Sequence, residues 1–423
     1  MSTQTLDSLC GVNPETLGTA TPMDMEFRYL DISAVTKGRI DWSTTRLWKY
    51  ADAPSRARRR LRSGDVLLCT VRPGLQAHAR IRQEENAPLV GSTGFAVLRP
   101  DLAGDSGFVF HQLFSDSVAV QLRALETGSS YPAVNEGDVR RVRVFCPEKE
   151  ERWRMAAVLD TVDEAIAKTE AVTAKLRQVR AGLLRDLLTR GLDPHGQLRD
   201  PIAHPEQFED SPLGRIPREW DIEKLAVACS LIKDGAHIPP KRVEAGPLLL
   251  GVQNMIDDQL QLTDADTRVP WEFFEAMHRT WQIIPGDVLL AVVGATIGKV
   301  ARVPSNFEPF TLQRSVAILR GRKDLLENDY LEIFLRGSYF QSLVKNSSNA
   351  TAQAGLYLGQ IAGLNIPLPK PEEQLLVSKQ IQEQEQEICL ERTYLSKLVA
   401  LKSGLMTDLL TGRVRVPETI RVG

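Results

Sequence analysis

The side chains in this chain that are best suited to chemistry are arginines and amides that can bind nucleic acid. Five arginines crowd together ahead of a short apolar run: Arg56, Arg58, Arg59, Arg60 and Arg62. The planar guanidinium group fits phosphate oxygens and the edge of guanine. Gln313 and Arg314 stand together before another apolar run, and a glutamine amide can pair with adenine in the same bidentate way.

Further candidates for nucleic-acid contacts lie in stretches rich in turn residues. Lys241 and Arg242 could contact phosphates, and Arg72 and Lys299 are further candidates for DNA contacts. Asn254 could reach a base, and Thr296 is another candidate for a DNA contact. Each of these residues has a simpler alternative, because a charge run can be a solvated face and a buried amide often caps a strand.

No catalytic or metal-binding set accompanies these residues. The segment Gly294-Ala295-Thr296-Ile297-Gly298-Lys299 resembles a phosphate-binding loop, but only three residues separate its glycines, and Val300 stands where Ser or Thr is needed. It predicts a glycine-bearing turn between strands. The six histidines are not spaced like metal ligands, so neither catalytic residues nor a metal site is predicted.

The elements that must position these residues occur twice, 222 positions apart. The matching pairs are Gly64–Leu68 with Gly286–Leu290, Ala79-Arg80 with Ala301-Arg302, and Gly182–Thr189 with Gly404–Thr411. The offset is the same at all three places, so the chain contains two copies of one module. Such a duplication indicates two similar ligands or one ligand with two halves.

Each copy ends in a long helical pattern, over 147–191 and 369–412. Mostly apolar positions from Met155 to Leu187, and from Val377 to Leu409, recur in steps of four and three. This period of 3.5 residues predicts a coiled coil, and helices of this length would be roughly 60 Å long. A domain between the two helices favours an antiparallel pair. The alternative is that each helix packs only on its own module.

The remaining segments, 1–146 and 211–368, mix short strands with turns and short helices, with a linker at 192–210 and a tail at 413–423. The expected strands are 66–68, 95–98, 142–145, 288–293 and 316–319. One short helix is expected in each module, over 107–123 and 329–345. The predicted fold class is therefore α+β, with two α/β modules separated by two long antiparallel helices in a pseudo-twofold internal repeat.

The composition is that of an ordinary globular chain. Charged residues make up 25% of the sequence and the net charge is −2, so no strong field draws the chain to nucleic acid or membranes. The five cysteines are scattered, which predicts reduced thiols in a cytoplasmic protein. The longest apolar run, Val288–Val293, is too short to span a bilayer.

Taken in order, the local motifs resemble those of the specificity subunits of Type I restriction-modification systems. The matching motifs are Pro217-x-x-Trp220, Gly286-Asp287-Val288-Leu289, Gly294-x-x-x-Gly298-Lys299, Gln313-Arg314-Ser315-Val316-Ala317, and Ile366-Pro367-Leu368-Pro369 followed by Glu372-Glu373-Gln374. Each motif alone is weak, but their order and duplication around two long helices are specific to that family. The first module departs from the pattern, because its glycine turn reads Arg72-Pro73-Gly74 and Ser92-Thr93 stands near the place of Gln313-Arg314.

The resemblance implies a noncatalytic subunit with two target recognition domains, each reading half of a split double-stranded DNA target. It also implies that the helices space these domains and dock two modification subunits. Methyl transfer with S-adenosylmethionine would belong to those partners, and ATP- and Mg-dependent translocation and cleavage to restriction subunits. Two alternatives remain: a coiled-coil scaffold with protein-binding modules, and the specificity half of a fused restriction enzyme.

Overall fold

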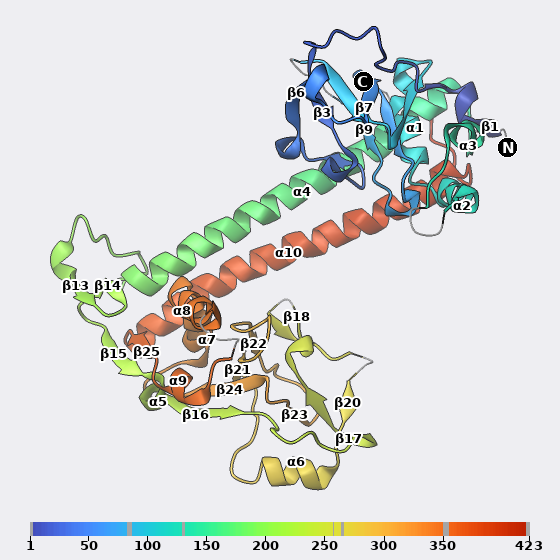
Figure 1. Ribbon diagram of the computed structural model, residues 1–423. Helices are drawn as coiled ribbons and strands as arrows, with labels where there is room; N and C mark the ends of the chain where they lie inside the picture. The colour runs from blue at the N-terminus through green and yellow to red at the C-terminus, as the bar shows by residue number, and fades with distance from the viewer. Residues whose placement is uncertain are drawn as a thin grey trace. The chain divides into compact units, whose positions relative to one another are not determined.

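The chain folds into two compact units that share two long helices (Figure 1). The computed structural model describes residues 3–82, 87–128, 132–256, 258–263, 266–349 and 355–419. The first unit comprises Met1–Ala171 with Arg392–Gly423, and the second comprises Val172–Glu391. The boundaries between the two units fall within α4 (Lys149–Arg190) and α10 (Pro371–Leu410). Each unit therefore holds the start of one long helix and the end of the other.

The first unit is built on two four-stranded sheets. One has the order β2 (Cys10–Val12), β11 (Phe95–Pro100), β8 (Val66–Cys69), β9 (Ala79–Arg80). The other has the order β6 (Arg46–Lys49), β3 (Glu26–Leu30), β10 (Leu89–Ser92), β7 (Ala57–Leu61), with β3 and β10 parallel. Two strand pairs complete the unit: β1 (Thr3–Thr5) with β12 (Arg143–Phe145), and β4 (Val35–Thr36) with β5 (Arg39–Ile40).

Three short helices follow the strands of the first unit: α1 (Ser106–Gln112), α2 (Asp116–Leu125) and α3 (Glu136–Arg141). The prediction of one helix over 107–123 is wrong, because Ser115 begins a new helix there. Its side chain accepts a hydrogen bond from the Val118 amide at 3.3 Å, which satisfies a free N–H group of the first turn.

The second unit contains a six-stranded and a three-stranded sheet. The first has the order β16 (Cys229–Asp234), β24 (Val316–Gly321), β21 (Val288–Ala291), β22 (Val300–Arg302), β19 (Gln259–Leu260), β18 (Met255–Ile256). The second has the order β20 (Thr267–Arg268), β17 (Val243–Leu250), β23 (Phe310–Leu312). Two further pairs are β13 (Phe208–Ser211) with β14 (Gly214–Pro217), and β15 (Asp221–Lys224) with β25 (Asn365–Leu368).

The helices of the second unit are α5 (Leu225–Ala228), α6 (Trp271–Met277), α7 (Asn328–Arg336), α8 (Ser338–Asn349) and α9 (Leu358–Ala362). The region 329–345 was also predicted as one helix, and it divides into α7 and α8 at Gly337. The backbone of Gly337 is extended, with a ψ of 150°. Extended backbone cannot continue the helical hydrogen-bond ladder, so a second helix begins at Ser338.

The internal repeat is confirmed at the level of topology. The sheet order β2-β11-β8-β9 recurs as β16-β24-β21-β22, and the parallel pair β3 and β10 recurs as β17 and β23. Helices α1, α2 and α3 correspond to α7, α8 and α9. The units also differ, because β7 pairs with β10 in the first unit, whereas α6 and the β13–β14 hairpin belong to the second.

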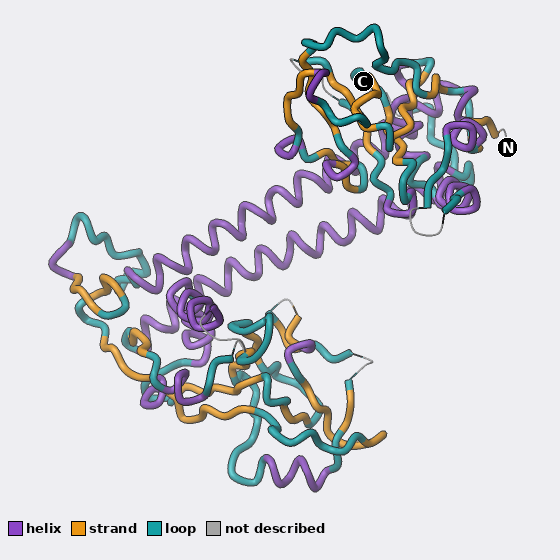
Figure 2. The backbone as a smooth tube through the Cα atoms, viewed as in Figure 1, coloured by secondary structure: helices purple, strands orange, loops and turns teal. Residues whose placement is uncertain are grey.

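The backbone trace shows α4 and α10 side by side (Figure 2), and their predicted antiparallel pairing is confirmed by side-chain packing within each unit. In the first unit, Val162 and Ile166 near the start of α4 pack with Leu398 near the end of α10. In the second unit, Leu184 and Leu187 near the end of α4 share a core with residues from the start of α10. Both helices also pack on the modules, so the two packing arrangements do not exclude each other.

Candidate nucleic-acid interface

In the second unit, the loops that carry several predicted contacts leave the sheets at one edge. Strands β17 and β23 run parallel, so Leu250 and Leu312 end side by side. Strands β21 and β16 run antiparallel to β24, which places Ala291 and Asp234 beside the start of β24. The segments 235–242, 251–254, 292–299 and 313–315 therefore begin at the same edge, which we call the loop edge of the second unit.

Gln313 and Arg314 are held firmly at this loop edge. The Gln313 amide donates to the Leu250 carbonyl at 2.8 Å, and its carbonyl accepts from the Val316 amide at 3.0 Å. The side chain of Gln313 is half-buried and that of Arg314 is exposed. A backbone fixed in this way holds the two side chains in place before a ligand arrives, which lowers the entropy cost of binding.

Thr296 and Lys299 lie at the same edge, in the turn that joins β21 to β22. The Lys299 carbonyl accepts from the Ala291 amide at 2.8 Å, and Thr296 is exposed. The prediction of a glycine-bearing turn between strands is confirmed. A phosphate-binding loop would instead lead from a strand into a helix.

Lys241 and Arg242 lie apart from the loop edge. They precede β17, at the end of that strand away from Leu250. Both are exposed, and the Arg242 guanidinium donates to the Thr267 hydroxyl beside it.

Asn254 does not fit its predicted role as a base contact. The residue is fully buried. Its side-chain oxygen accepts from the Gly251 amide at 2.9 Å, and its nitrogen donates to the Gln261 carbonyl at 3.1 Å and to Asp266 at 2.7 Å. Because these groups already satisfy the amide, Asn254 shapes the loop and is unavailable to a base.

The first unit has an equivalent loop edge, where Arg56 and Arg72 lie. Arg56 directly precedes β7, and its carbonyl accepts from the Thr93 amide at 2.8 Å. Thr93 occupies the turn between β10 and β11, the counterpart of the Gln313-Arg314 turn. Arg72 lies between β8 and β9, and its amide donates to the Pro132 carbonyl at 2.7 Å. Both arginines are exposed.

Asp31, which follows β3, lies near Arg56 at this edge. Burial acts to raise the pKa of the Asp31 carboxyl, but hydrogen bonds from Ser33 and Tyr29 and the charge of Arg56 together lower it. The carboxylate is therefore held in its charged form beside the Arg56 guanidinium.

The prediction of one dense basic patch at 56–62 is wrong. Arg58, Arg59 and Arg60 lie within strand β7, whose side chains alternate between its two faces. Arg58 stacks over the Tyr50 ring at 5.1 Å, and Arg59 donates to the Thr16 hydroxyl at 3.2 Å.

Arg60 and Arg62 both lie close to the half-buried carboxylate of Glu15. Both form ion pairs with Glu15, Arg60 at 3.8 Å. Burial acts to raise the pKa of Glu15, but hydrogen bonds from Arg99 and Arg62 lower it. Only Arg56 of the original cluster therefore lies at the loop edge of the first unit.

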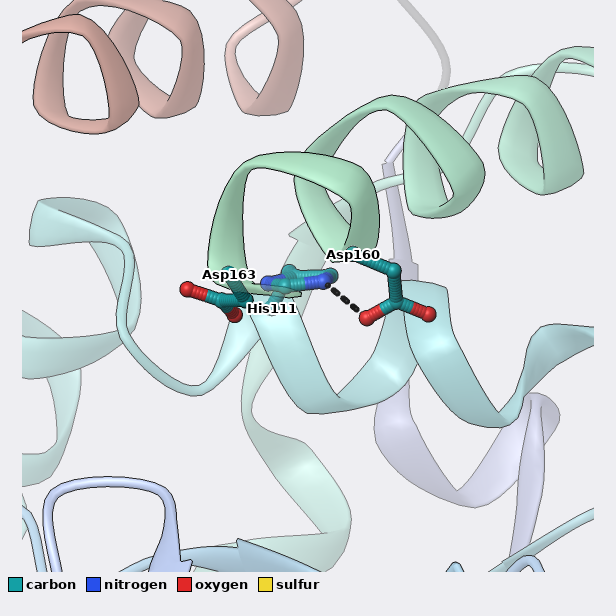
Figure 3. Close-up of side chains that lie close together, drawn as sticks. All are labelled: His111, Asp160 and Asp163. Carbon is teal, nitrogen blue, oxygen red and sulfur yellow. Dashed lines mark hydrogen bonds and ion pairs between the residues drawn. The ribbon is translucent and has the colours of Figure 1, made fainter. Parts of the chain in front are cut away.

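One group of side chains has the spacing of a metal site (Figure 3). The ligand atoms of His111, Asp160 and Asp163 lie within 4.8 Å of one another. Arg80 pairs with Asp160 at 2.8 Å, however, and Lys402 pairs with Asp163 at 2.6 Å. Burial acts to raise the pKa of Asp160, while the His111 hydrogen bond and the Arg80 charge lower it to about 2. Both carboxylates already have cationic partners, so the group ties α1 and the long helices together.

Gln253, which lies next to Asn254 and is exposed at the loop edge of the second unit, is not among the contacts predicted from the sequence. Both residues belong to the same short segment, and amide chemistry alone does not distinguish them. The signal that separates them is burial, which depends on the fold of the whole unit.

Comparison with known proteins gives consistent matches. A family model for the Type I restriction modification DNA specificity domain matches residues 279–398. The MjaVIII specificity subunit of a Type I restriction enzyme from Methanocaldococcus jannaschii is 22% identical over 301 residues, which are 70% of this chain and 67% of that relative. The putative MjaX specificity subunit from the same organism is 22% identical over 67% of this chain and 62% of its own length.

Solved structures resemble the chain over nearly all of its length. A chain from a study of complex assembly and conformational transition of the type I R-M system matches with a TM-score of 0.58 and 25% identity, over 98% of both chains. The S subunit of the M. genitalium Type-I restriction-modification system matches in fold, with a TM-score of 0.56 and 14% identity over 97% of this chain and 96% of that one. Among the described residues, no helix is both long and apolar enough to cross a membrane. In its duplicated modules and in these matches, the chain is similar to the specificity subunits of Type I restriction-modification systems.

Proposed function

We propose that this chain recognises a split double-stranded DNA target, with one half-site read by each unit. The observation that carries the proposal is the repeated loop edge, where Arg56 and Arg72 lie in the first unit and Gln313 and Arg314 in the second. Arginine reads guanine and glutamine reads adenine, and each good bidentate pair contributes about 1–3 kcal/mol of discrimination. Thr296 and Lys299 add contacts at the second edge, while Lys241 and Arg242 contact the DNA backbone.

We also propose that the chain performs no catalysis and places other subunits on the DNA. Exposed apolar side chains support two equivalent partner surfaces on the long helices. Tyr394 and Leu401 on α10 are 52% and 51% exposed, and Val172 and Val179, their counterparts 222 positions earlier on α4, are each 46% exposed. Equivalent surfaces suit two copies of one partner.

In this proposal, those partners are two modification subunits, which hold S-adenosylmethionine and transfer the methyl group. Restriction subunits use ATP and Mg²⁺ for translocation and cleavage. This chain holds no cofactor itself, and the assembly works in the cytoplasm. Under this proposal, each modification subunit would cover one of the exposed apolar pairs on the long helices.

The test is to express the full chain from its own locus with Arg56→Ala or Arg314→Ala and to sequence DNA modification in the host genome. Deleting the chain should abolish one split methylation motif. Each variant should relax a single half of that motif by about 5- to 100-fold, and the two variants should affect opposite halves. Arg322→Ala is the control, because Arg322 is an exposed arginine that pairs with Asp324 beyond the other end of β24. Persistence of every split motif after deletion would contradict the proposed function.

A further inference from the structure

Two glutamine side chains meet over one glycine at the loop edge of the second unit. A Cβ atom added to Gly251 would lie 2.6 Å from the side-chain oxygen of Gln253 and 2.8 Å from that of Gln313. Both carboxamides thus occupy the space that a side chain at position 251 would need. They come from different segments of the chain, one after β17 and the other after β23.

The backbone beneath this glutamine pair is fixed from two sides. The Gln313 amide donates to the Leu250 carbonyl at 2.8 Å, and the Ala236 amide donates to the Leu312 carbonyl at 2.7 Å. A Cβ on Gly235 would lie 2.0 Å from the Leu312 carbonyl oxygen, so the neighbouring loop approaches as closely as a glycine allows. The site is therefore rigid at the backbone and free only at the ends of the two side chains.

Neither carboxamide has a hydrogen-bond partner among the residues that the structure describes. Structural amides in the same unit behave differently. The Gln374 side chain makes three hydrogen bonds, to Leu325, Pro369 and Glu327, at 2.8, 2.8 and 2.9 Å. The Gln341 side chain donates to Gly298 and Leu335 at 2.9 and 2.7 Å. Gln253 and Gln313 thus lie next to each other on a fixed backbone, and the donors and acceptors of their carboxamides are available to a ligand.

From this juxtaposition we infer that Gln253 and Gln313 act together as an adenine-reading pair in the half-site of the second unit. The inference rests on the proposed function and makes it more specific. A carboxamide offers one acceptor and an NH₂ donor, which match the N6 amino group and N7 of adenine in the major groove. Two adjacent carboxamides at a sheet edge can contact one A·T pair or two successive pairs.

Gly251→Ala tests the inference without changing either glutamine. Gly251 has an extended backbone with a φ of −137°, which alanine adopts without strain. The added methyl group would displace only the flexible ends of Gln253 and Gln313. We expect Gly251→Ala, Gln253→Ala and Gln313→Ala to relax discrimination at the same A·T position of one half-site by about tenfold or more, with the other half-site unchanged.

The measurement is modification sequencing of host genomes that carry each variant of the full chain, scored at every position of the motif. Two controls are matched in chemistry. Gln282→Ala removes an exposed glutamine that precedes β21, at the opposite end of that strand from the loop edge. Gly182→Ala adds a methyl group on α4, where no atom lies within 4 Å apart from the neighbouring backbone of the helix itself. Both controls should keep the wild-type motif.

The outcomes separate this inference from the proposed function. If Arg314→Ala relaxes the motif while the three variants at the glutamine pair leave it unchanged, the inference is overturned and the proposed function stands. Relaxation at G·C positions, or at different positions for Gly251→Ala and the glutamine variants, would also overturn the inference. So would loss of all modification, which would assign the pair a structural role.

Discussion

His78 is a buried polar residue whose protonation is coupled to the stability of the first unit. Its ring lies against Phe114, with 5.5 Å between the ring centroids, and its Nδ1 atom accepts from the Cys69 amide at 3.0 Å. Burial lowers the pKa of His78 from 6.5 to about 4. Between these pH values the unfolded chain holds a proton that the folded chain does not. The contribution is therefore fully present above pH 6.5 and is lost progressively toward pH 4.

We predict that this residue makes the free energy of unfolding fall by up to about 1.4 kcal/mol per pH unit across that window. His111 adds to the same trend, because burial is the main cause of its lowered pKa. His78→Asn keeps an acceptor for the Cys69 amide and should make the fall with pH shallower, although lost packing lowers stability at every pH. Urea unfolding of the full chain at several pH values measures this slope. An unaltered slope in His78→Asn, matching the exposed control His204→Asn, would contradict the prediction.

Residue type predicts which side chains at the candidate site could form hydrogen bonds with DNA. Exposure decides which of them are accessible to it. Gln313 and Arg314 were identified from the sequence because they precede an apolar run, and both lie at the loop edge. Asn254 has the same chemistry but is buried and fully bonded. The five-arginine run looked like one patch because the acid that attracts two of its members, Glu15, lies more than forty positions earlier in the chain.

The long helices carry a repeated ion pair that interrupts their apolar stripes. In the first unit, Lys402 of α10 pairs with Asp163 of α4 at 2.6 Å. In the second unit, Arg180 of α4 pairs with Glu385 of α10 at 2.5 Å. The two acids are 222 positions apart, as are the two bases. Polar pairs inside a coiled-coil seam fix the register of the helices, so this charge pattern supports one antiparallel alignment.

We predict a measurable coupling between the members of each pair. Asp163→Asn and Lys402→Met should each lower the free energy of unfolding, and the double variant should lose less than the sum of the two. The expected coupling energy is about 0.5–1.5 kcal/mol, because both side chains are less than a third exposed. A double-mutant cycle in denaturant gives this value. Strictly additive losses would show that the pair does not set the register, and Lys397→Met, an exposed lysine on the same helix, controls for loss of charge.

Among the helices and strands, the sequence predicted best those that have a long periodic pattern of apolar residues. The 3.5-residue period runs through more than thirty residues, which is enough to identify both helices and their partners. Shorter elements were harder to predict. The breaks at Ser115 and Gly337 interrupt segments that otherwise look helical, so they are decided by local capping and backbone geometry. Strand β7 was missed because its three central residues are arginines, and only Ala57 and Leu61 are buried.

Across the whole molecule, the repeat conserves the scaffold while the loop edges differ. Both units share sheet order and helix order, but β7 brings Arg56 to the first loop edge, whereas Gln313 and Arg314 lie at the second. The sequence predicted the shared part because identical residue types recur at one offset. It could not place the contacts of the first unit, because the strand that supplies Arg56 has no counterpart 222 positions later. Under the proposed function, the two half-sites therefore differ in sequence.

The long helices provide the last prediction, which tests their proposed role as a spacer. The variant lacks one heptad from each helix, residues 168–174 of α4 and 391–397 of α10. Each deleted segment includes the position along its helix where one unit ends and the other begins. Seven helical residues rise about 10 Å, which corresponds to roughly three base pairs of DNA. Because a whole heptad is removed from both helices, the apolar stripes stay in phase and Asp163 can still pair with Lys402. Val172 and Tyr394 are deleted, and Val179 and Leu401, which lie seven residues further on, take their heptad positions, so one apolar residue of each partner surface is kept. Modification sequencing should reveal the same two half-sites with a spacer shorter by about three base pairs. A motif that kept its original spacer would mean that the helices do not set the distance between the half-sites.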